Sequence, residues 1–330
     1  MIKKLGFYPL LFILCLPAFS AGSKNCREIR GVFDIGSGST KMKVFEWDEC
    51  RDKLIDELKK CSDHKKVAYK EDLKNSNEIK ASTIEYGIKK LKELKLKAIS
   101  CGATEFSGAA TSAFRQAKNG ESAANYIAKK TGVRIQVVSQ QDEAKLGVIG
   151  AKLKANIENK DVCIWDIGGS SMQITCESGD KTKRYLGHLA SVPFKNEVLK
   201  LKASKKISPN PIGKETLSLI NPLIKSESED IFDSIGKLLS KNIVIGIGGV
   251  HYYAVSKSVK KNRYNPSDLK AWITKSINFN DKELGGGDFV DTLVTNVILV
   301  QGLMRELKIK NVTAYKVNLA DGVLASKSFW

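Results

Sequence analysis

Two stretches of the chain, Asp34-Ile-Gly-Ser-Gly-Ser-Thr40 and Asp166-Ile-Gly-Gly-Ser-Ser171, repeat one pattern. In each, an apolar strand ends at an aspartate, glycines and hydroxyl residues follow, and a second apolar stretch comes after them. This order predicts a β-hairpin with a glycine-rich turn. Glycine lets successive backbone N–H groups face one anion, and the aspartate is placed to hold a hydrated divalent cation. The repetition therefore predicts a phosphate group held from two sides.

A third glycine-rich segment runs from Gly246 to Gly249, after an apolar strand and before a predicted helix from His251. An anion is favoured at a helix N-terminus, although a tight turn between strand and helix accounts for the glycines equally well. We include Gly248 and Gly249 among the candidate phosphate ligands.

Predicted strands and helices alternate around these loops, which indicates an α/β architecture. Residues 48–77 are charged and predict a short helix with an irregular connection. Further helices are expected over 82–96, 121–130, 142–153, 192–239 and 289–307, and further strands near 104–110, 134–139, 183–186 and 312–317.

The first 21 residues have the composition of a secretory signal peptide. Lys3 and Lys4 precede an apolar run that ends at Leu16, and small residues follow up to Ala21. The run is too short for a membrane span. We therefore expect cleavage after Ser20, no membrane span after cleavage, and a periplasmic or secreted mature protein.

Seven cysteines are present, and Cys15 lies inside the signal segment. An exported chain can form disulfides, but the remaining cysteines allow many pairings. Cys26 and Cys50 flank the first hairpin, and Cys163 and Cys176 flank the second, so each of these pairs could form a disulfide. Cys61 and Cys101 would then either pair with each other or stay free. Alternatively, Cys163 and Cys176 are small core residues of central strands. No Cys/His spacing indicates zinc.

The net charge of +18 favours a polyanionic ligand. Many of the lysines lie on predicted helical faces, where a solvated surface explains them equally well. The chain has neither zinc-finger spacing nor an RNA-binding aromatic signature, so we expect no nucleic-acid partner.

The ordered motifs resemble the exopolyphosphatase and guanosine pentaphosphate phosphatase family, within the superfamily of actin, sugar kinases and ecto-apyrases. The resemblance runs from about 32 to 324, and its most diagnostic block is Ala110-Thr-Ser-Ala-Phe-Arg-Gln-Ala-Lys-Asn-Gly120. It implies two ribonuclease-H-like (actin-like ATPase) α/β domains facing a central cleft. The first would comprise 22–141 with about 312–330, and the second 142–311.

The resemblance also implies roles for individual residues. Glu143 would be the catalytic base that aligns and deprotonates a water, and Arg115 would neutralise phosphate charge. Asp34 and Asp166 would hold Mg²⁺, and Gln173 would position water, as the matching glutamine does in ecto-apyrases. The expected phosphate-binding residues are Gly36, Ser37, Gly38, Ser39, Thr40, Lys41, Gly168, Gly169, Ser170, Ser171, Gly248 and Gly249.

The chain departs from the family pattern at four of these motif positions. Gly38 stands where the family usually has asparagine, and Gln173 where it usually has glutamate. In the acid motif, Gln140 replaces a glycine and Asp142 replaces the first glutamate. These departures weaken any transfer of substrate specificity.

We therefore expect an exported Mg²⁺-dependent phosphoanhydride hydrolase that releases terminal phosphate from inorganic polyphosphate or a nucleoside polyphosphate. One alternative is an apyrase-like nucleoside tri- or diphosphatase, with Tyr252 and Tyr253 as candidate platforms for the base. The other is a polyphosphate- or nucleotide-binding sensor without turnover, which the altered acid motif leaves open. A homodimer is one option for the assembly.

Overall fold

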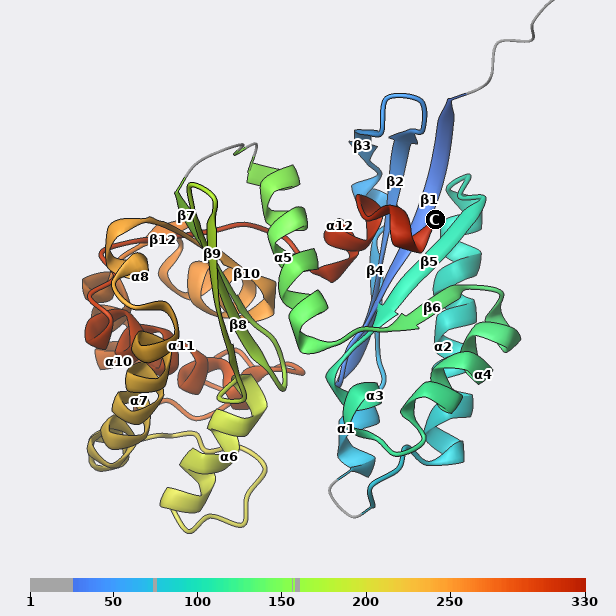
Figure 1. The fold of residues 1–330 in the computed structure, drawn as a ribbon. Helices are drawn as coiled ribbons and strands as arrows, with labels where there is room; N and C mark the ends of the chain where they lie inside the picture. The colour runs from blue at the N-terminus through green and yellow to red at the C-terminus, as the bar shows by residue number, and fades with distance from the viewer. Residues whose placement is uncertain (1–25, 74–75, 156, 158–160) are drawn as a thin grey trace, which may run out of the picture.

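The computed structural model describes residues 26–73, 76–155, 157 and 161–330. The predicted signal peptide, 1–21, lies outside the described residues. The described chain forms two lobes, each built around a six-stranded mixed sheet (Figure 1). The predicted α/β class is confirmed. None of the described helices combines the length and apolar character that a membrane crossing requires.

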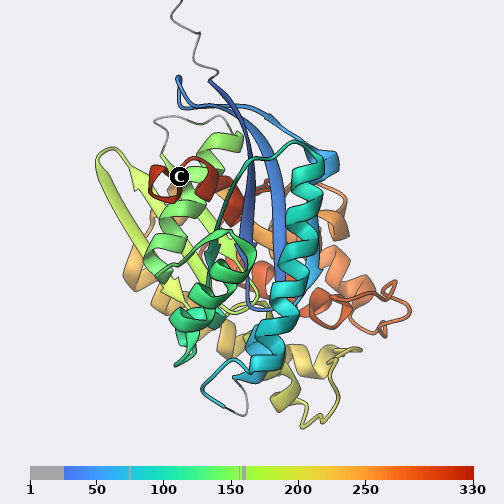
Figure 2. The same ribbon diagram turned by 90° about the vertical axis from the view of Figure 1, so that its right-hand side faces the viewer.

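The first sheet has the order β3-β2-β1-β5-β6, with β4 also paired to β2. Val32 and Phe33 are both fully buried on opposite faces of β1, because helices cover the sheet on both sides. The strands are β1 Arg27–Ile35, β2 Ser39–Asp48, β3 Lys53–Glu57, β4 Asp63–Lys66, β5 Glu105–Ala110 and β6 Arg134–Val137. Helices α2 (Ala81–Ser100) and α4 (Gly120–Thr131) cover the outer face, where α2 lies along the sheet in Figure 2.

The second sheet has the order β11-β12-β10-β7-β8-β9. Its strands are β7 Val162–Ile167, β8 Met172–Ser178, β9 Lys181–Gly187, β10 Ile243–Ile247, β11 Arg263–Tyr264 and β12 Val312–Ala314. Its main core is formed with α6 (Ser191–Leu201), α7 (Lys214–Ile235), α10 (Pro266–Ser276) and α11 (Val290–Glu306).

The two sheets share one topology. In each, an antiparallel run of three strands (β1-β2-β3, β7-β8-β9) is followed by parallel strands added beside its first member (β5 and β6, β10 and β12). Both predicted hairpins are confirmed, and each glycine-rich loop connects the first two strands of its sheet. The two loops therefore occupy equivalent places in the two lobes.

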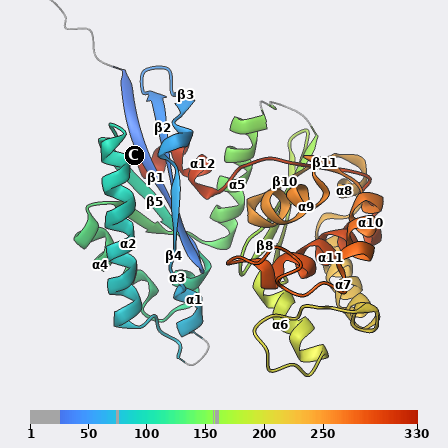
Figure 3. The ribbon, with the colours of Figure 1, turned by 180° about the vertical axis from the view of Figure 1, so that it is seen from behind.

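Helices α5 (Gln140–Ala155) and α12 (Leu319–Leu324) lie between the lobes (Figures 1 and 3). They cross closely: a Cβ at Gly322 would lie 2.1 Å from the backbone oxygen of Leu146. A buried ion pair holds this crossing to the first sheet, because the Lys43 ammonium lies 2.7 Å from the Asp321 carboxylate.

The structure differs from the sequence analysis in two places. The strand expected near 312 as part of the first domain is β12, which pairs with β10 in the second sheet; only the following helix α12 packs on the first sheet. Residues 48–77 also contain β3 and β4, two strands that the charged sequence did not suggest. Both contribute mainly exposed or half-buried residues at the sheet edge, so they lack an apolar repeat.

The remaining helices are short. They are α1 Tyr69–Asp72, α3 Ser112–Gln116, α8 Leu238–Lys241, α9 Lys257–Val259, the 3₁₀ turns η1 Lys59–Cys61 and η3 Lys327–Phe329, and the π-helix η2 Val250–Ser256. The helix expected from His251 is thus a π-helix.

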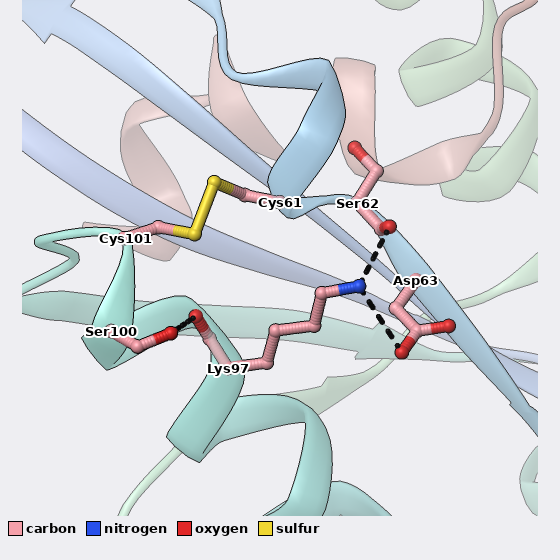
Figure 4. Close-up of a disulfide and its surroundings, with 6 residues drawn as sticks. All are labelled: Cys61, Ser62, Asp63, Lys97, Ser100 and Cys101. Atoms are coloured by element: carbon pink, nitrogen blue, oxygen red, sulfur yellow. Dashed lines mark hydrogen bonds and ion pairs between the residues drawn. A yellow bond between two sulfur atoms is a disulfide. The ribbon is translucent and has the colours of Figure 1, made fainter.

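Three disulfides connect Cys26 to Cys50, Cys61 to Cys101 and Cys163 to Cys176. Cys163 and Cys176 face each other across β7 and β8 and are fully buried, so they are both a disulfide and part of the core. The Cys61–Cys101 bond, shown in Figure 4, joins η1 to the end of α2.

Candidate active site

The two hairpin loops have the same backbone geometry. The Gly36 N–H donates to the Ser39 carbonyl at 2.9 Å, and the Gly168 N–H donates to the Ser171 carbonyl at the same distance. Across each hairpin, the leading aspartate faces one residue of the return strand, which is Lys41 in the first loop and Gln173 in the second.

Carbonyl oxygens of both loops are bound by the segment that packs behind them. In the first loop, the Val67 and Lys70 N–H groups donate to the carbonyls of Gly38 and Ser37, at 3.1 and 3.0 Å. In the second, Ser191 and Val192 at the start of α6 donate to Gly168 and Gly169, at 3.2 and 2.9 Å. Carbonyl oxygens repel an anion. Because N–H groups behind each loop already bond to these oxygens, each loop is better suited to bind a phosphate.

The loop glycines leave open space rather than adopt a left-handed backbone. A Cβ added at Gly38 or Gly169 would meet nothing within 4 Å, and neither residue has a positive φ. Gly248 is different, because it has a φ of +82° and a Cβ there would lie 2.3 Å from Asp166 Oδ1. The third loop therefore lies directly against the aspartate of the second, and only glycine fits at this contact.

Lys41 connects the charges of the two lobes. Its ammonium lies 3.1 Å from Asp34 Oδ2, and the charges of Asp34 and, less strongly, Asp166 raise its pKa. Burial raises the pKa of Asp166 to about 6, although Lys41 opposes the shift. The structure thus brings Asp34, Lys41 and Asp166 together, as expected of a site made from both hairpins.

Glu143 and Arg115 form a pair beside these aspartates. Arg115, on α3, donates from Nη1 to Glu143 Oε2 at 3.0 Å and to the Val138 carbonyl at 2.9 Å. The Glu143 side chain, in the first turn of α5, is only 12% exposed. Burial raises its pKa to about 7; Arg115 opposes this shift, whereas the charges of Asp166 and Asp34 add to it. A carboxylate with a pKa near neutrality is suited to accept a proton.

The two altered residues of the acid motif have structural roles. The Asp142 N–H donates to Ser139 Oγ at 3.0 Å and the Ser139 hydroxyl donates back to the Asp142 carboxylate, so Ser139 caps α5 while Asp142, the third residue of the helix, supports that cap and faces solvent. Gln140 donates from Nε2 to the Gly187 carbonyl at 3.0 Å, which ties α5 to the second sheet. Neither takes the place of Glu143.

Gln173 is 2% exposed, and its Nε2 has no hydrogen-bond partner among the described residues. It lies next to Asp166 on the neighbouring strand, so its buried amide is a donor available to a water or a phosphate oxygen. Thr40 is placed differently. Its side chain is 1% exposed and bonds to Tyr69, so its hydroxyl lies in the core of the first lobe.

The sequence motifs do not predict that the segment with β4 and α1 belongs to the site. It supplies the N–H groups that bind the first loop, and it places Lys66 and Lys70 beside that loop. Its one sequence signal is the pair of apolar residues, Val67 and Tyr69, among lysines; both are buried.

Part of the chain is similar in sequence to curated exopolyphosphatases. Exopolyphosphatase 1 from Mycobacterium bovis and from Mycobacterium tuberculosis is 33% identical to the chain over 78 residues, which is 24% of this chain. The matched part spans 23% of the length of these relatives.

Solved structures share the fold over almost the whole chain. A Ppx/GppA family member from Aquifex aeolicus superposes with a TM-score of 0.70 and 17% identity, covering 92% of this chain and 98% of that one. An exopolyphosphatase from Cytophaga hutchinsonii gives 0.71 and 14%, covering 90% and 96%. The expected two-domain fold class is thereby confirmed. The profile of the Ppx/GppA phosphatase family matches residues 57–328, and the chain therefore belongs to that family.

Proposed function

We propose that this protein is an exported, Mg²⁺-dependent hydrolase that releases terminal phosphate from polyphosphate or a nucleoside polyphosphate. The observation that carries the proposal is the placement of Glu143, a buried carboxylate with a pKa near 7, beside Arg115 and within the field of both loop aspartates.

In the proposed reaction, ionised Glu143 aligns a water with the terminal phosphorus and accepts its proton. An oxygen–phosphorus bond forms, the bridging phosphoanhydride bond breaks, and the bridging oxygen leaves on the shortened chain. The contacts that the described residues make with the Arg115 guanidinium come through Nη1, which leaves its other N–H groups for phosphate oxygens. Ser37, Ser39, Ser170 and Ser171, with the loop N–H groups, would bind the same phosphate.

The donor atoms fit a magnesium ion. Asp34 and Asp166 offer hard carboxylate oxygens from the two lobes, and burial raises the pKa of Asp166, a shift that a bound cation would reverse. Mg²⁺ bound here would neutralise phosphate charge between the loops.

Export is supported by the predicted signal peptide together with the three disulfides of the structure.

Two observations bear on the alternative functions. The buried amide of Gln173 favours an apyrase-like nucleotidase, because it stands where that class positions water. The altered acid motif is the main argument for a sensor without turnover. That argument weakens, because Asp142 bonds to the cap of α5, Gln140 ties α5 to the second sheet, and Glu143 stays at the site.

A phosphate-release panel tests the proposal. The mature protein is assayed with Mg²⁺ on long polyphosphate, tripolyphosphate, ATP and ADP, and again after chelation. We expect Mg²⁺-dependent release that Glu143→Gln abolishes while ligand binding persists. Glu121→Gln is the matched control, because Glu121 is an exposed first-turn glutamate of α4. No release from any substrate by the wild type would favour the sensor, and full turnover by Glu143→Gln would remove Glu143 from the mechanism.

A further inference from the structure

The segment from Asp63 to Lys70 forms an additional wall of the first phosphate loop. Strand β4 pairs with β2 so that Lys66 faces Ser39, and the segment then donates two backbone N–H groups to the loop carbonyls. The backbone of this segment therefore has a defined position relative to the loop.

The start of this segment is anchored to α2, as Figure 4 shows. Cys61 is joined to Cys101, and the Lys97 ammonium lies 3.3 Å from both the Ser62 carbonyl and the Asp63 carboxylate. An edge strand held at one end by a disulfide and at the other by the loop can support a binding site.

Lys70 reaches the residue next to Arg115. Its ammonium donates to the Gln116 side-chain oxygen, and Gln116 is itself oriented by its bond to Ser112 Oγ at 2.8 Å. Partial burial and the nearby Arg115 charge lower the pKa of Lys70. In the part of the chain that the structure describes, no carboxylate forms an ion pair with Lys70, and Arg115 is paired only with Glu143. Two cations thus lie close enough for their charges to interact, and the one carboxylate beside them, Glu143, is bonded to Arg115 and not to Lys70, so an added anion would stabilise the pair.

Lys66 continues the positive charge outward from the site. Its ammonium is 3.9 Å from Asp288 Oδ1, and both side chains are mostly exposed at 62% and 67%. A pair at this distance and exposure is weak, so a phosphate can replace it at little cost. Arg115, Lys70 and Lys66 therefore offer successive positive charges beside the first loop.

We propose that Lys70 and Lys66 are specificity-determining residues that bind the inner phosphate groups of linear polyphosphate. This inference rests on the proposed function and names its substrate. A linear polyphosphate carries charge along its whole length, whereas a nucleotide continues into an uncharged sugar and base. Of the candidate base platforms, Tyr253 already has two neighbours, the Lys257 ammonium 4.8 Å from its ring centroid and the Tyr252 ring at 5.0 Å between centroids, while 51% of Tyr253 stays exposed.

The test compares Lys70→Ala, Lys70→Arg and Lys92→Ala with the wild type. Lys92 is exposed on α2 and makes no ion pair or hydrogen bond with the described residues, so its loss controls for net charge. Initial rates are measured on long polyphosphate, tripolyphosphate and ATP over a range of salt concentrations, and thermal melting checks that each variant is folded.

We expect Lys70→Ala to raise KM for long polyphosphate about tenfold, with kcat nearly unchanged, because one charge-assisted hydrogen bond to bound substrate is lost. The salt dependence of KM should weaken, Lys70→Arg should restore most of the affinity, and ATP should be affected much less. Equal losses for ATP and long polyphosphate would overturn the assignment to polyphosphate. An unchanged KM in a folded Lys70→Ala variant would overturn the subsite itself.

Binding separates this proposal from the catalytic one. Fluorescently labelled polyphosphate is titrated into wild type, Lys70→Ala and Lys92→Ala, with anisotropy as the readout. If the wild type hydrolyses nothing, the proposed function fails, yet weaker binding by Lys70→Ala alone still supports the subsite. Equal binding by all three proteins refutes it.

Discussion

The Glu143 carboxylate links catalysis to stability, and the replacement Glu143→Gln tests this link. Burial raises the pKa of Glu143 from 4.5 to about 7, so the folded protein holds the proton more tightly than the unfolded chain does. At about 1.4 kcal/mol per pKa unit, keeping this group ionised above pH 7 costs roughly 3 kcal/mol of folding free energy. The sign is set by the raised pKa: wild-type stability falls as the pH rises from 4.5 through 7.

Glutamine has the shape of the protonated acid and carries no charge at any pH. We therefore expect ligand-free Glu143→Gln to be more stable than the wild type by roughly 3 kcal/mol at pH 8, and by less than about 1 kcal/mol at pH 5. Urea unfolding at the two pH values, without Mg²⁺, measures the difference. Glu121→Gln should show no such dependence on pH, since this side chain is exposed.

The same ionisation should appear in the rate. Because a base must be ionised, kcat/KM should fall about tenfold per pH unit on the acid side of the pKa of Glu143. Mg²⁺ lowers the pKa of nearby carboxyl groups, so this limb should move below pH 7 as Mg²⁺ increases. A Glu143→Gln variant no more stable than the wild type at pH 8, or a kcat/KM that is flat down to pH 4, would refute the reasoning.

Three further replacements test the framework of the site. Gly248→Ala should nearly abolish phosphate release without unfolding the protein, because a Cβ would collide with the aspartate of the second loop; normal activity would contradict this contact. Asp321→Asn should destabilise the fold by about 1 to 3 kcal/mol in urea, because buried Lys43 would keep only the Glu57 carboxylate, 3.7 Å away, as an ion-pair partner, and Lys43→Met combined with Asp321→Leu should recover part of the loss. Cys101→Ala should cost about 2 to 5 kcal/mol and raise KM for polyphosphate, because Cys61 anchors the wall of the first loop; an unchanged KM would show that the loop alone holds that wall.

The hairpins and most of the regular elements could be predicted from the sequence because their signals are local. An apolar strand followed by a glycine-rich turn can be recognised within about ten residues. The spacing of Ile84, Ile88 and Leu91 likewise indicates the helix α2 from a short stretch of sequence. Strands β3 and β4 could not be predicted in this way. They lie at the sheet edge and are stabilised by pairing with β2, which the sequence does not display.

The candidate site also combines residues that the sequence indicates with contacts that only the fold creates. Asp142 and Glu143 are adjacent acids that look alike in the sequence, yet consecutive residues of a helix point about 100° apart. Asp142 therefore bonds to the N-cap residue Ser139 and faces solvent, while Glu143 is buried beside Arg115. Lys70 lies 45 positions before Arg115 in the chain, and only the folding of β4 onto β2 brings the two charges together.

The two hairpins occupy equivalent places in their lobes, but they differ in the residue that faces the aspartate. The position across the strand from each aspartate holds Lys41 in the first loop and Gln173 in the second. The first loop thus supplies a cation for its own aspartate, whereas the second offers an amide that cannot neutralise Asp166. Burial raises the pKa of Asp166, Lys41 of the first loop opposes this shift from across the site, and the charge of Asp166 in turn helps to raise the pKa of Glu143. If Gln173 were replaced by lysine, the second loop would acquire the same internal ion pair. We expect the demand for Mg²⁺ to weaken and the pKa of Glu143 to fall, so that the acid limb of kcat/KM moves to lower pH. A limb that stays in place would show that Asp166 does not control the ionisation of the base.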